Sequence, residues 1–523
     1  MKGFFNKCNI EVLFSAIFLI IAIKLNLQFL DGSNINTLIA GHDEYIAIKE
    51  VYSILHPVSW KHFIMAFMSG NALYYGRILF YLDALFAYLP FKIWGVTGMV
   101  LSIRIFHSLC LLGALLVLSR TFLTSNLQRV LFFLGTFCLY FTMYFIMMPK
   151  PEPMQLLFIA LFLNRFKKSN WSFGWHFVLI GIAYGLKFNV LLILPLVFLL
   201  PLVKSGTLKL KNEIIPAFKS IAFTLLGIVI AIPCLILTPV KPIFLNTYLH
   251  ETFGGTVKGY DNASLTFNDW MTAGLGGSYL GHWTLAYPFY LFLIVLFVIN
   301  IRKSYKTKDF SSAILMAFGI VFSAVIMLKT KRLWPHYLWT SYVFMCVGIV
   351  SSLPIKIEKL QAKIILGFIV IFTSSSIFFY CYRELPIFIN LSNGSDVKVN
   401  RKWSNQAFEY INTNYPGSKV GTDGSLLNLF SQFVEVDIYH PFSGTVPESK
   451  DTRYQWYWDF PMKIWDKSDI VVFYKRHPKR MLIEKPNYQM GHHVEINNFY
   501  NTMVPSKFER DTNFGEIIIY KRK

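Results

Sequence analysis

Long apolar runs separated by short polar stretches extend along most of the chain. Many of them are roughly 17–25 residues long, which is the length that a helix needs to cross a bilayer. The pattern predicts about eleven crossings. They fall at residues 12–30, 99–119, 130–147, 154–163, 173–202 as two short crossings, 220–237, 285–299, 312–328, 337–353 and 364–382.

Two apolar runs depart from a simple crossing. The segment 74–94 contains Arg77 and Asp83, and charges are costly inside the bilayer. We predict that it lies along the membrane surface, because a full crossing there would invert the sides of the basic clusters that follow. The run 173–202 is too long for one ordinary crossing, and we predict a bend near residues 187–189.

The chain changes character after residue 382, where polar residues become frequent. An amphipathic helix followed by spaced β-rich runs is typical of a small α/β domain. The helix is predicted at 403–415, and the strands at 419–422, 469–474 and 516–520. The chain thus divides into a transmembrane module, residues 1–382, whose first outer loop (about 31–98) carries juxtamembrane helices, and an extracytoplasmic α/β domain, residues 383–523.

Composition and charge support this division. Hydrophobic residues make up 54% of the 523 residues, which excludes a soluble enzyme. The net charge is +21, but residues 1–382 hold 31 Lys and Arg against 13 Asp and Glu, whereas the remainder holds 19 against 16. The basic excess therefore belongs to the membrane part, where it sets orientation and meets anionic lipid, and it does not indicate nucleic acid.

The positive-inside rule orients the chain. With the N-terminus in the cytoplasm, almost every basic cluster falls inside and residues 383–523 fall outside. We predict a multi-pass protein of the plasma (inner) membrane. The six cysteines lie in or beside apolar segments and form neither a disulfide framework nor a CxxC metal motif.

Acidic residues are scarce in the membrane module, and Asp43 and Glu44 are its one adjacent pair. They follow the first apolar segment, on the predicted outer side. A solvated helix start is the simpler interpretation of such a pair. The alternative is that one carboxylate serves as the base that removes a hydroxyl proton.

Several cations break the positive-inside rule and lie on the predicted outer side. A single one is explained by a side chain that reaches the membrane surface from a helix end, but six on one leaflet indicate an anion such as lipid phosphate. They are Arg77, Lys150, Lys187, Lys329, Lys331 and Arg332.

His336 and Glu152 are further candidates. His336 stands beside Lys331 and Arg332 and would complete a phosphate clamp, unless it is an ordinary interfacial residue. Glu152 lies between two prolines and is either a site residue or part of a helix break. The sequence has no phosphate-binding loop, no HExxH and no GxSxG motif.

The order of these features resembles the GT-C superfamily of polytopic glycosyltransferases, which includes protein O-mannosyltransferases and the lipid A aminoarabinose transferase. The resemblance covers residues 11–382 in order and spacing, and residues 383–523 in kind. The matching residues are Asp43-Glu44, Tyr75-Gly76-Arg77, Lys150-Pro151-Glu152, Tyr184-Gly185-Leu186-Lys187 and the segment from Arg332 to Tyr337.

This resemblance implies an inverting glycosyltransferase that moves a sugar from a polyprenyl phosphate to a hydroxyl of a glycan, lipid or protein acceptor. Asp43 would be the catalytic base, with Glu44 orienting the acceptor or the sugar. No cofactor is required, although Asp43 or Glu152 could ligate a divalent metal. The donor phosphate would be bound by Arg77, Lys187, Lys331, Arg332 and His336, supported by Lys150, Glu152 and Tyr337.

Two other functions stay open. An O-antigen-type polymerase or ligase is also polytopic and has outer basic residues, but it needs no acid pair in the first loop. A lipid or sugar transporter would account for the bent run 173–202 as a broken helix, although the sequence shows no paired halves.

Overall fold

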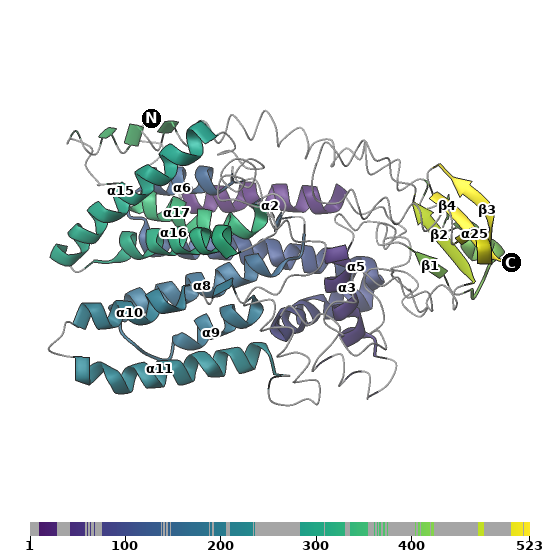
Figure 1. The fold of residues 1–523 in the computed structure, drawn as a ribbon, viewed down its shortest axis with the longest axis horizontal. Coiled ribbons are helices and arrows are strands. Elements are labelled where there is room, and N and C mark those ends of the chain that lie inside the picture. Colours follow the sequence, from purple (N-terminus) through teal and green to yellow (C-terminus); the bar gives the residue numbers. More distant parts are fainter. Residues whose placement is uncertain are drawn as a thin grey trace.

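The structure is a computed structural model, and it is mostly helical (Figure 1). It describes residues 10–28, 42–57, 76–235, 283–353 and 504–523, with short gaps, together with parts of 60–67, 360–374, 403–422 and 469–474. The helices of its main body are α2 (Ile10–Gln28), α3 (His42–Leu55), α5 (Arg77–Phe122), α6 (Asn126–Phe137), α8 (Pro151–Lys168), α9 (Phe177–Leu186), α10 (Leu194–Ser205), α11 (Leu210–Ala231), α15 (Trp283–Thr307), α16 (Ser311–Lys329), the short 3₁₀ helix η4 (Pro335–Leu338) and α17 (Trp339–Ser351).

Within these described ranges, five helices are long and apolar enough to cross a membrane, so the protein is a multi-pass membrane protein. They span Ile10–Leu27, Arg77–Gly95, Thr97–Phe122, Asn212–Ala231 and Ser311–Leu328. The predicted bend in 173–202 is confirmed, because α9 ends at Leu186 and α10 begins at Leu194. Most of the predicted crossing at 364–382 lies outside the described residues.

The helical bundle has two chemically different ends, which α8 connects. One end, called here the basic end, holds the last turn of α8 with Arg165, Lys167 and Lys168. Lys167 Nζ donates to the Thr121 carbonyl at 2.8 Å, so α5 also ends there. The 18 residues of α8 span about 27 Å, close to the thickness of the hydrocarbon core.

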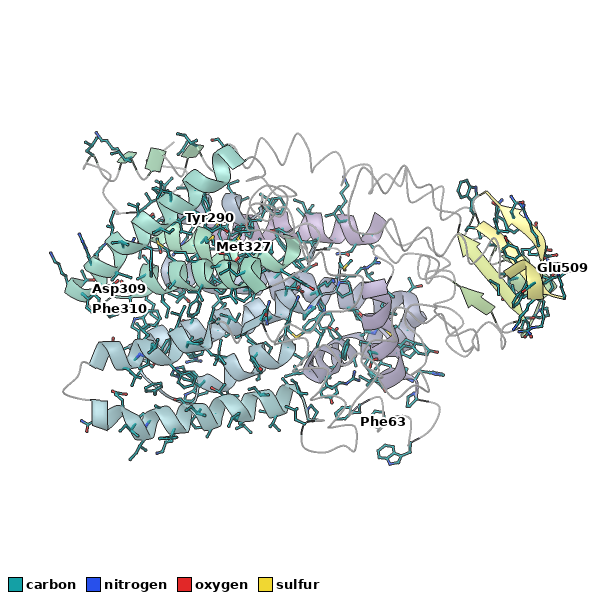
Figure 2. The ribbon with its side chains drawn as sticks, in the orientation of Figure 1. Phe63, Tyr290, Asp309, Phe310, Met327 and Glu509 are labelled. Atoms are coloured by element: carbon teal, nitrogen blue, oxygen red, sulfur yellow. The ribbon has the colours of Figure 1, made fainter. Side chains whose placement is uncertain are left out.

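The opposite end is called the α3 end, because α3 and the start of α5 lie there (Figure 1). It is also where α8 begins and where α9 ends. Figure 2 shows the separation of the two ends, with Asp309 and Phe310 at the basic end and Phe63 at the α3 end. Most chain segments that carry predicted site residues therefore meet at one end of the bundle.

Helix α5 is bent at Gly95, whose φ of 61° lies in the left-handed region that glycine adopts without strain. The second half, Thr97–Phe122, has 26 residues and spans about 39 Å, longer than α8. Since its last residue is at the basic end, its first residue reaches the α3 end. Arg77 begins the first half at that same end, so we infer that this half lies across the bundle end. Its placement along the membrane surface stays a prediction, because Arg77–Gly95 is also long and apolar enough to cross a membrane.

The α3 end of α5 packs closely on α9 and α11 because small residues meet there. A Cβ atom at Gly76 would lie 2.4 Å from the Gly185 carbonyl oxygen and 3.1 Å from the Ala231 oxygen. The Gly76 amide also donates to the Leu186 carbonyl at 3.5 Å. Small residues allow helix backbones to approach in this way, and here they bring two ends of helices together.

A four-stranded sheet lies beyond the α3 end of the bundle (Figure 1). Its order is β1-β2-β4-β3, with β1 parallel to β2 and the other pairs antiparallel. The helical residues Ala407 and Ile411 pack on Ile470 and Ile519 of the sheet. The elements are β1 (Val420–Thr422), β2 (Ile470–Tyr474), the short helix α25 (Val504–Lys507), β3 (Phe508–Phe514) and β4 (Ile517–Arg522).

Three of these strands occur where the sequence predicts them, and β3 was not predicted. Its sequence, FERDTNF, is mostly polar and lacks the apolar alternation of a half-buried strand. It forms the edge of the sheet, paired with β4 through a two-residue turn that begins at Gly515 (φ 58°). An edge strand needs fewer apolar residues, which explains why the pattern missed it.

Candidate active site at the α3 end of the bundle

Lys187 and Glu152 form an ion pair at the α3 end. Lys187 Nζ lies 2.5 Å from Glu152 Oε1, and the two side chains are 14% and 1% exposed. The ammonium also lies over the Tyr337 ring, 4.4 Å from its centroid. Segments from α8, α9 and η4 thus meet at one cation, and each contributes a residue that the sequence analysis named as a candidate.

The local sequence explains why Glu152 and Lys187 face each other. Lys150 is the N-cap of α8 and has an extended backbone conformation. Pro151, at the first helical position, favours an extended residue before it and a helix start at its own position. Glu152 therefore lies in the first turn, where the helix dipole favours an anion. Lys187 is the C-cap of α9, where a cation is favoured.

Gln155 of α8 completes this junction. Its Nε2 lies 2.6 Å from the Lys187 carbonyl, 3.0 Å from the Ala183 carbonyl and 2.9 Å from Asn189 Oδ1. The last carbonyls of a helix have no partner within the helix, so the amide satisfies groups that the break after α9 leaves open. The hydrogen bonds of Gln155 therefore stabilise the break after α9 and keep Lys187 at the helix end.

Arg77 is the second buried cation at this end. Its side chain is 2% exposed, and its Nη1 lies 2.6 Å from Glu50 Oε2, itself 3% exposed. The guanidinium also stacks over the Phe80 ring, 4.9 Å from the centroid. The hydrogen bond between Gly76 and Leu186 joins the residues directly before Arg77 and Lys187. The backbones of the two cations are therefore close together.

Asp43 and Glu44 lie in the first turn of α3, and their side chains lie outside the described part of the structure. The backbone of α3 determines their positions along the helix. Asp43 precedes Glu50 by seven residues, or two turns, so the two positions share one face of α3 about 10 Å apart. That face is the buried one, because Ala47, Glu50 and Val51 are all less than 6% exposed.

Lys150 is buried, with 4% of its surface exposed, and its backbone carbonyl is held by a histidine of α5. His107 Nδ1 lies 2.8 Å from that oxygen, and His107 Nε2 lies 2.9 Å from Asp83 Oδ1. His107 and Asp83 are at most 1% exposed. This polar chain joins both halves of α5 to the first turn of α8.

The remaining predicted site residues are only partly placed. His336 lies in η4, directly before Tyr337, but its side chain is outside the described part of the structure. Lys331 and Arg332 also lie outside the described residues. In the part of the chain that the structure describes, no three His, Cys, Asp or Glu side chains group as a metal site would require.

Sequence reasoning missed four contributors to this end of the bundle. Glu50 and Asp83 are acids of the membrane module, but the sequence assigned no partner to either of them. His107 and Gln155 are single polar residues within apolar runs. A buried polar residue in such a run needs a partner, and that rule was the available signal.

The apolar helices define a multi-pass membrane protein, and the charged pairs form a polar site at one end of its helical bundle. Among solved structures, the chain is similar to ArnT from Cupriavidus metallidurans bound to undecaprenyl phosphate, with a TM-score of 0.56. Sequence identity is 11%, and the match covers 97% of each chain.

The apo state of the same ArnT matches with a TM-score of 0.55 and the same identity and coverage. The chain therefore has the GT-C fold of this aminoarabinose transferase along nearly its whole length. The resemblance inferred from sequence motifs is confirmed at the level of fold. No protein-family model and no curated protein sequence matches the chain.

Proposed function

We propose that the protein is an inverting glycosyltransferase that moves a sugar from a polyprenyl phosphate to an acceptor hydroxyl on the outer face of the membrane. The observation that carries this proposal is the buried Lys187–Glu152 pair at one end of the bundle, beside the start of α5 with Arg77. Cations at the end of an apolar bundle are suitable partners for the phosphate of a membrane lipid. The GT-C fold, seen in an ArnT bound to undecaprenyl phosphate, supports a polyprenyl-phosphate donor.

The proposed reaction assigns one role to each group. The Asp43 carboxylate takes the proton of the acceptor hydroxyl, and the acceptor oxygen attacks the anomeric carbon from the face opposite the phosphate. The bond between that carbon and the phosphate oxygen breaks, and its electron pair stays on the phosphate. Glu44 orients the acceptor or the sugar. One substitution at the anomeric carbon inverts its configuration.

The cations act on the charge that develops on the leaving phosphate. A phosphodiester donor carries one negative charge and the departing phosphate monoester carries two, so attraction to Arg77 and Lys187 increases during the reaction. Glu50 and Glu152 hold these cations in place before the donor arrives. Such preorganisation avoids the cost of reorienting charges at the moment of transfer.

Other predicted residues complete the donor site in this proposal. Lys331, Arg332 and His336 bind the phosphate from the segment before Tyr337, and Lys150 lies in the same turn as Glu152. The second oxygen of Glu152, Oε2, is buried and accepts no hydrogen bond from the described residues. It would accept one from a sugar hydroxyl.

The orientation follows from the charges of the two ends. Arg165, Lys167 and Lys168 lie at the basic end with Lys306 in the last turn of α15, and the positive-inside rule places such clusters in the cytoplasm. The α3 end and the C-terminal sheet would then be extracytoplasmic, in a plasma membrane. Labelling of single cysteines at Lys306 and at Lys507 in sealed, oriented vesicles tests this side assignment.

Transfer from radiolabelled polyprenyl-phosphate sugars to a membrane extract tests the function. Wild type is compared with Asp43→Asn, and with Lys306→Ala as a control, because Lys306 is exposed at the basic end. We expect Asp43→Asn to lose transfer and keep donor binding, while the control keeps both. The same assay with a chelator tests the prediction that no metal is required.

Two outcomes of the transfer assay would contradict the proposal. Equal transfer by wild type and Asp43→Asn would remove Asp43 as the base. Absence of transfer by wild type from every polyprenyl-phosphate sugar tested would favour a polymerase, a ligase or a transporter.

A further inference from the structure

We propose that Asp83 and His107 are positioning residues that fix the first turn of α8, and with it Glu152 and Lys187, in the geometry needed for transfer. This inference rests on the proposed function. The two residues do not contact the cation pair themselves. They act through the Lys150 carbonyl, which His107 contacts at 2.8 Å.

The hydrogen-bond chemistry of this chain is restricted. A backbone carbonyl only accepts, so His107 must donate from Nδ1 to the Lys150 oxygen. A neutral ring then has its lone pair on Nε2, which faces Asp83 Oδ1 at 2.9 Å and Oδ2 at 3.2 Å. Two lone pairs repel each other at this distance. A proton therefore lies between the ring and the carboxyl group, which makes the pair electrically neutral as a whole.

The surroundings of the pair favour a proton that is shared between the His107 ring and the Asp83 carboxyl group. Asp83 and His107 are at most 1% exposed, so neither gains water as an alternative partner. Cys110, one turn beyond His107 on the same helix, is buried, and Arg77 and Arg104 are the buried cations nearest to the pair in the sequence. Removing one member of the pair would leave the other buried with an unmet hydrogen bond.

The position of the Lys150 carbonyl determines where Glu152 lies. Only Pro151 stands between Lys150 and Glu152, and Pro151 and Pro153 restrict the backbone of this turn. Ser108, the neighbour of His107, donates to the Ile146 carbonyl at 2.8 Å. This bond fixes the backbone just before the same turn. A shift of this turn would move Glu152 and, through the ion pair, the ammonium of Lys187.

Asp83 also links the hydrogen-bond chain to the segment that carries Arg77, the second cation of the site. It belongs to the half of α5 that begins with Arg77, while His107 belongs to the half that crosses the bundle. The pair therefore fixes the Arg77 segment, the crossing helix and the α8 turn relative to one another. Apolar side chains would fill the same space without the cost of burying polar groups, so stability alone does not explain this pair.

The chemistry provides a matched pair of variants. In Asp83→Asn the amide donates to Nε2 while Nδ1 still donates to the Lys150 carbonyl, so both hydrogen bonds persist without the shared proton. In Asp83→Ala and His107→Ala the chain of hydrogen bonds is broken. The double variant Asp83→Leu/His107→Leu removes both polar groups at once, which avoids an unpaired buried partner and favours folding.

The experiment measures kcat, and KM for a polyprenyl-phosphate sugar, on folded protein in lipid nanodiscs. We expect His107→Ala, Asp83→Ala and the double leucine variant to lower kcat by about 10-fold or more with KM changed by less than about threefold, because small misplacements of reacting groups lower rates strongly. Asp83→Asn should stay within about threefold of wild type. Equal losses in Asp83→Asn and Asp83→Ala, or an unchanged kcat in all variants, would overturn the proposal.

A second measurement does not depend on transfer. Amide hydrogen exchange of the peptide covering residues 146–156 should accelerate in His107→Ala and remain near wild type in Asp83→Asn. Unchanged exchange in His107→Ala would overturn the positioning role even if wild type transfers sugar. Faster exchange in His107→Ala, together with no transfer by wild type from any donor, would support the structural link and remove the proposed function.

Discussion

Replacement of Lys187 and Glu152, singly and together, separates the contribution of their ion pair to stability from its contribution to transfer. Lys187→Met leaves the Glu152 carboxylate, 1% exposed, without its cation. Breaking a buried pair in this way costs about 3–5 kcal/mol, and the 14% exposure of Lys187 places the expected loss near about 3 kcal/mol. Glu152→Gln should cost less, about 1–2 kcal/mol, because the ammonium reaches water and keeps the Tyr337 ring.

The double variant Lys187→Met/Glu152→Gln is the decisive one. Both charges are absent, so the free energy of unfolding should return to within about 1 kcal/mol of wild type. Transfer should not return, because no ammonium remains at that position to stabilise the leaving phosphate. Unfolding in detergent and transfer from a polyprenyl-phosphate sugar measure the two quantities on the same preparation.

Lys187→Arg and Lys306→Ala serve as controls in this cycle. The first keeps a cation at the end of α9, and the second removes an exposed cation from the basic end. Transfer by the double variant at the wild-type rate would refute the reasoning, since the pair would then be structural only. Additive stability losses would show that the two groups do not interact in the folded protein.

Two further predictions concern other parts of the bundle. Gly76→Ala places a Cβ 2.4 Å from a backbone oxygen of α9 and should cost about 1–3 kcal/mol of stability and lower transfer, whereas Gly367→Ala, with no atom of the described residues within 4 Å, should be silent in both assays. Glu50→Gln removes the Glu50 carboxylate from the buried Arg77 guanidinium, which should lower the thermal unfolding midpoint and transfer together, and an unchanged midpoint would argue against a pair of this strength.

The site was partly predictable because charged residues are rare in apolar segments. Arg77, Lys187 and Glu152 were identified as candidates from their unusual places alone, and the structure brings Lys187 and Glu152 into contact. Tyr337 was predicted through the family resemblance, and its ring lies beside Lys187. The catalytic role of Asp43 stays a prediction, which the transfer assay tests.

The partners of these residues were not predictable. Arg77 pairs with Glu50 across 27 positions, and His107 pairs with Asp83 across 24. Hydrophobic periodicity shows which face of a helix is buried, but it carries no information about which helix covers that face. A polar residue such as His107 therefore looks like an isolated exception until the neighbouring helix is known.

By itself, the sequence determined the membrane class, many of the helical segments, the break after α9 and three of the four strands, because the lengths and periods of apolar runs follow from local geometry. It also determined which charges lie at helix ends, since prolines and apolar boundaries place them there. The tertiary structure alone decided that Glu152 meets Lys187, that Glu50 meets Arg77, and that α5 bends at Gly95. These facts depend on close contacts between small residues such as Gly76 and Gly185, which set helix neighbours and which no local pattern encodes.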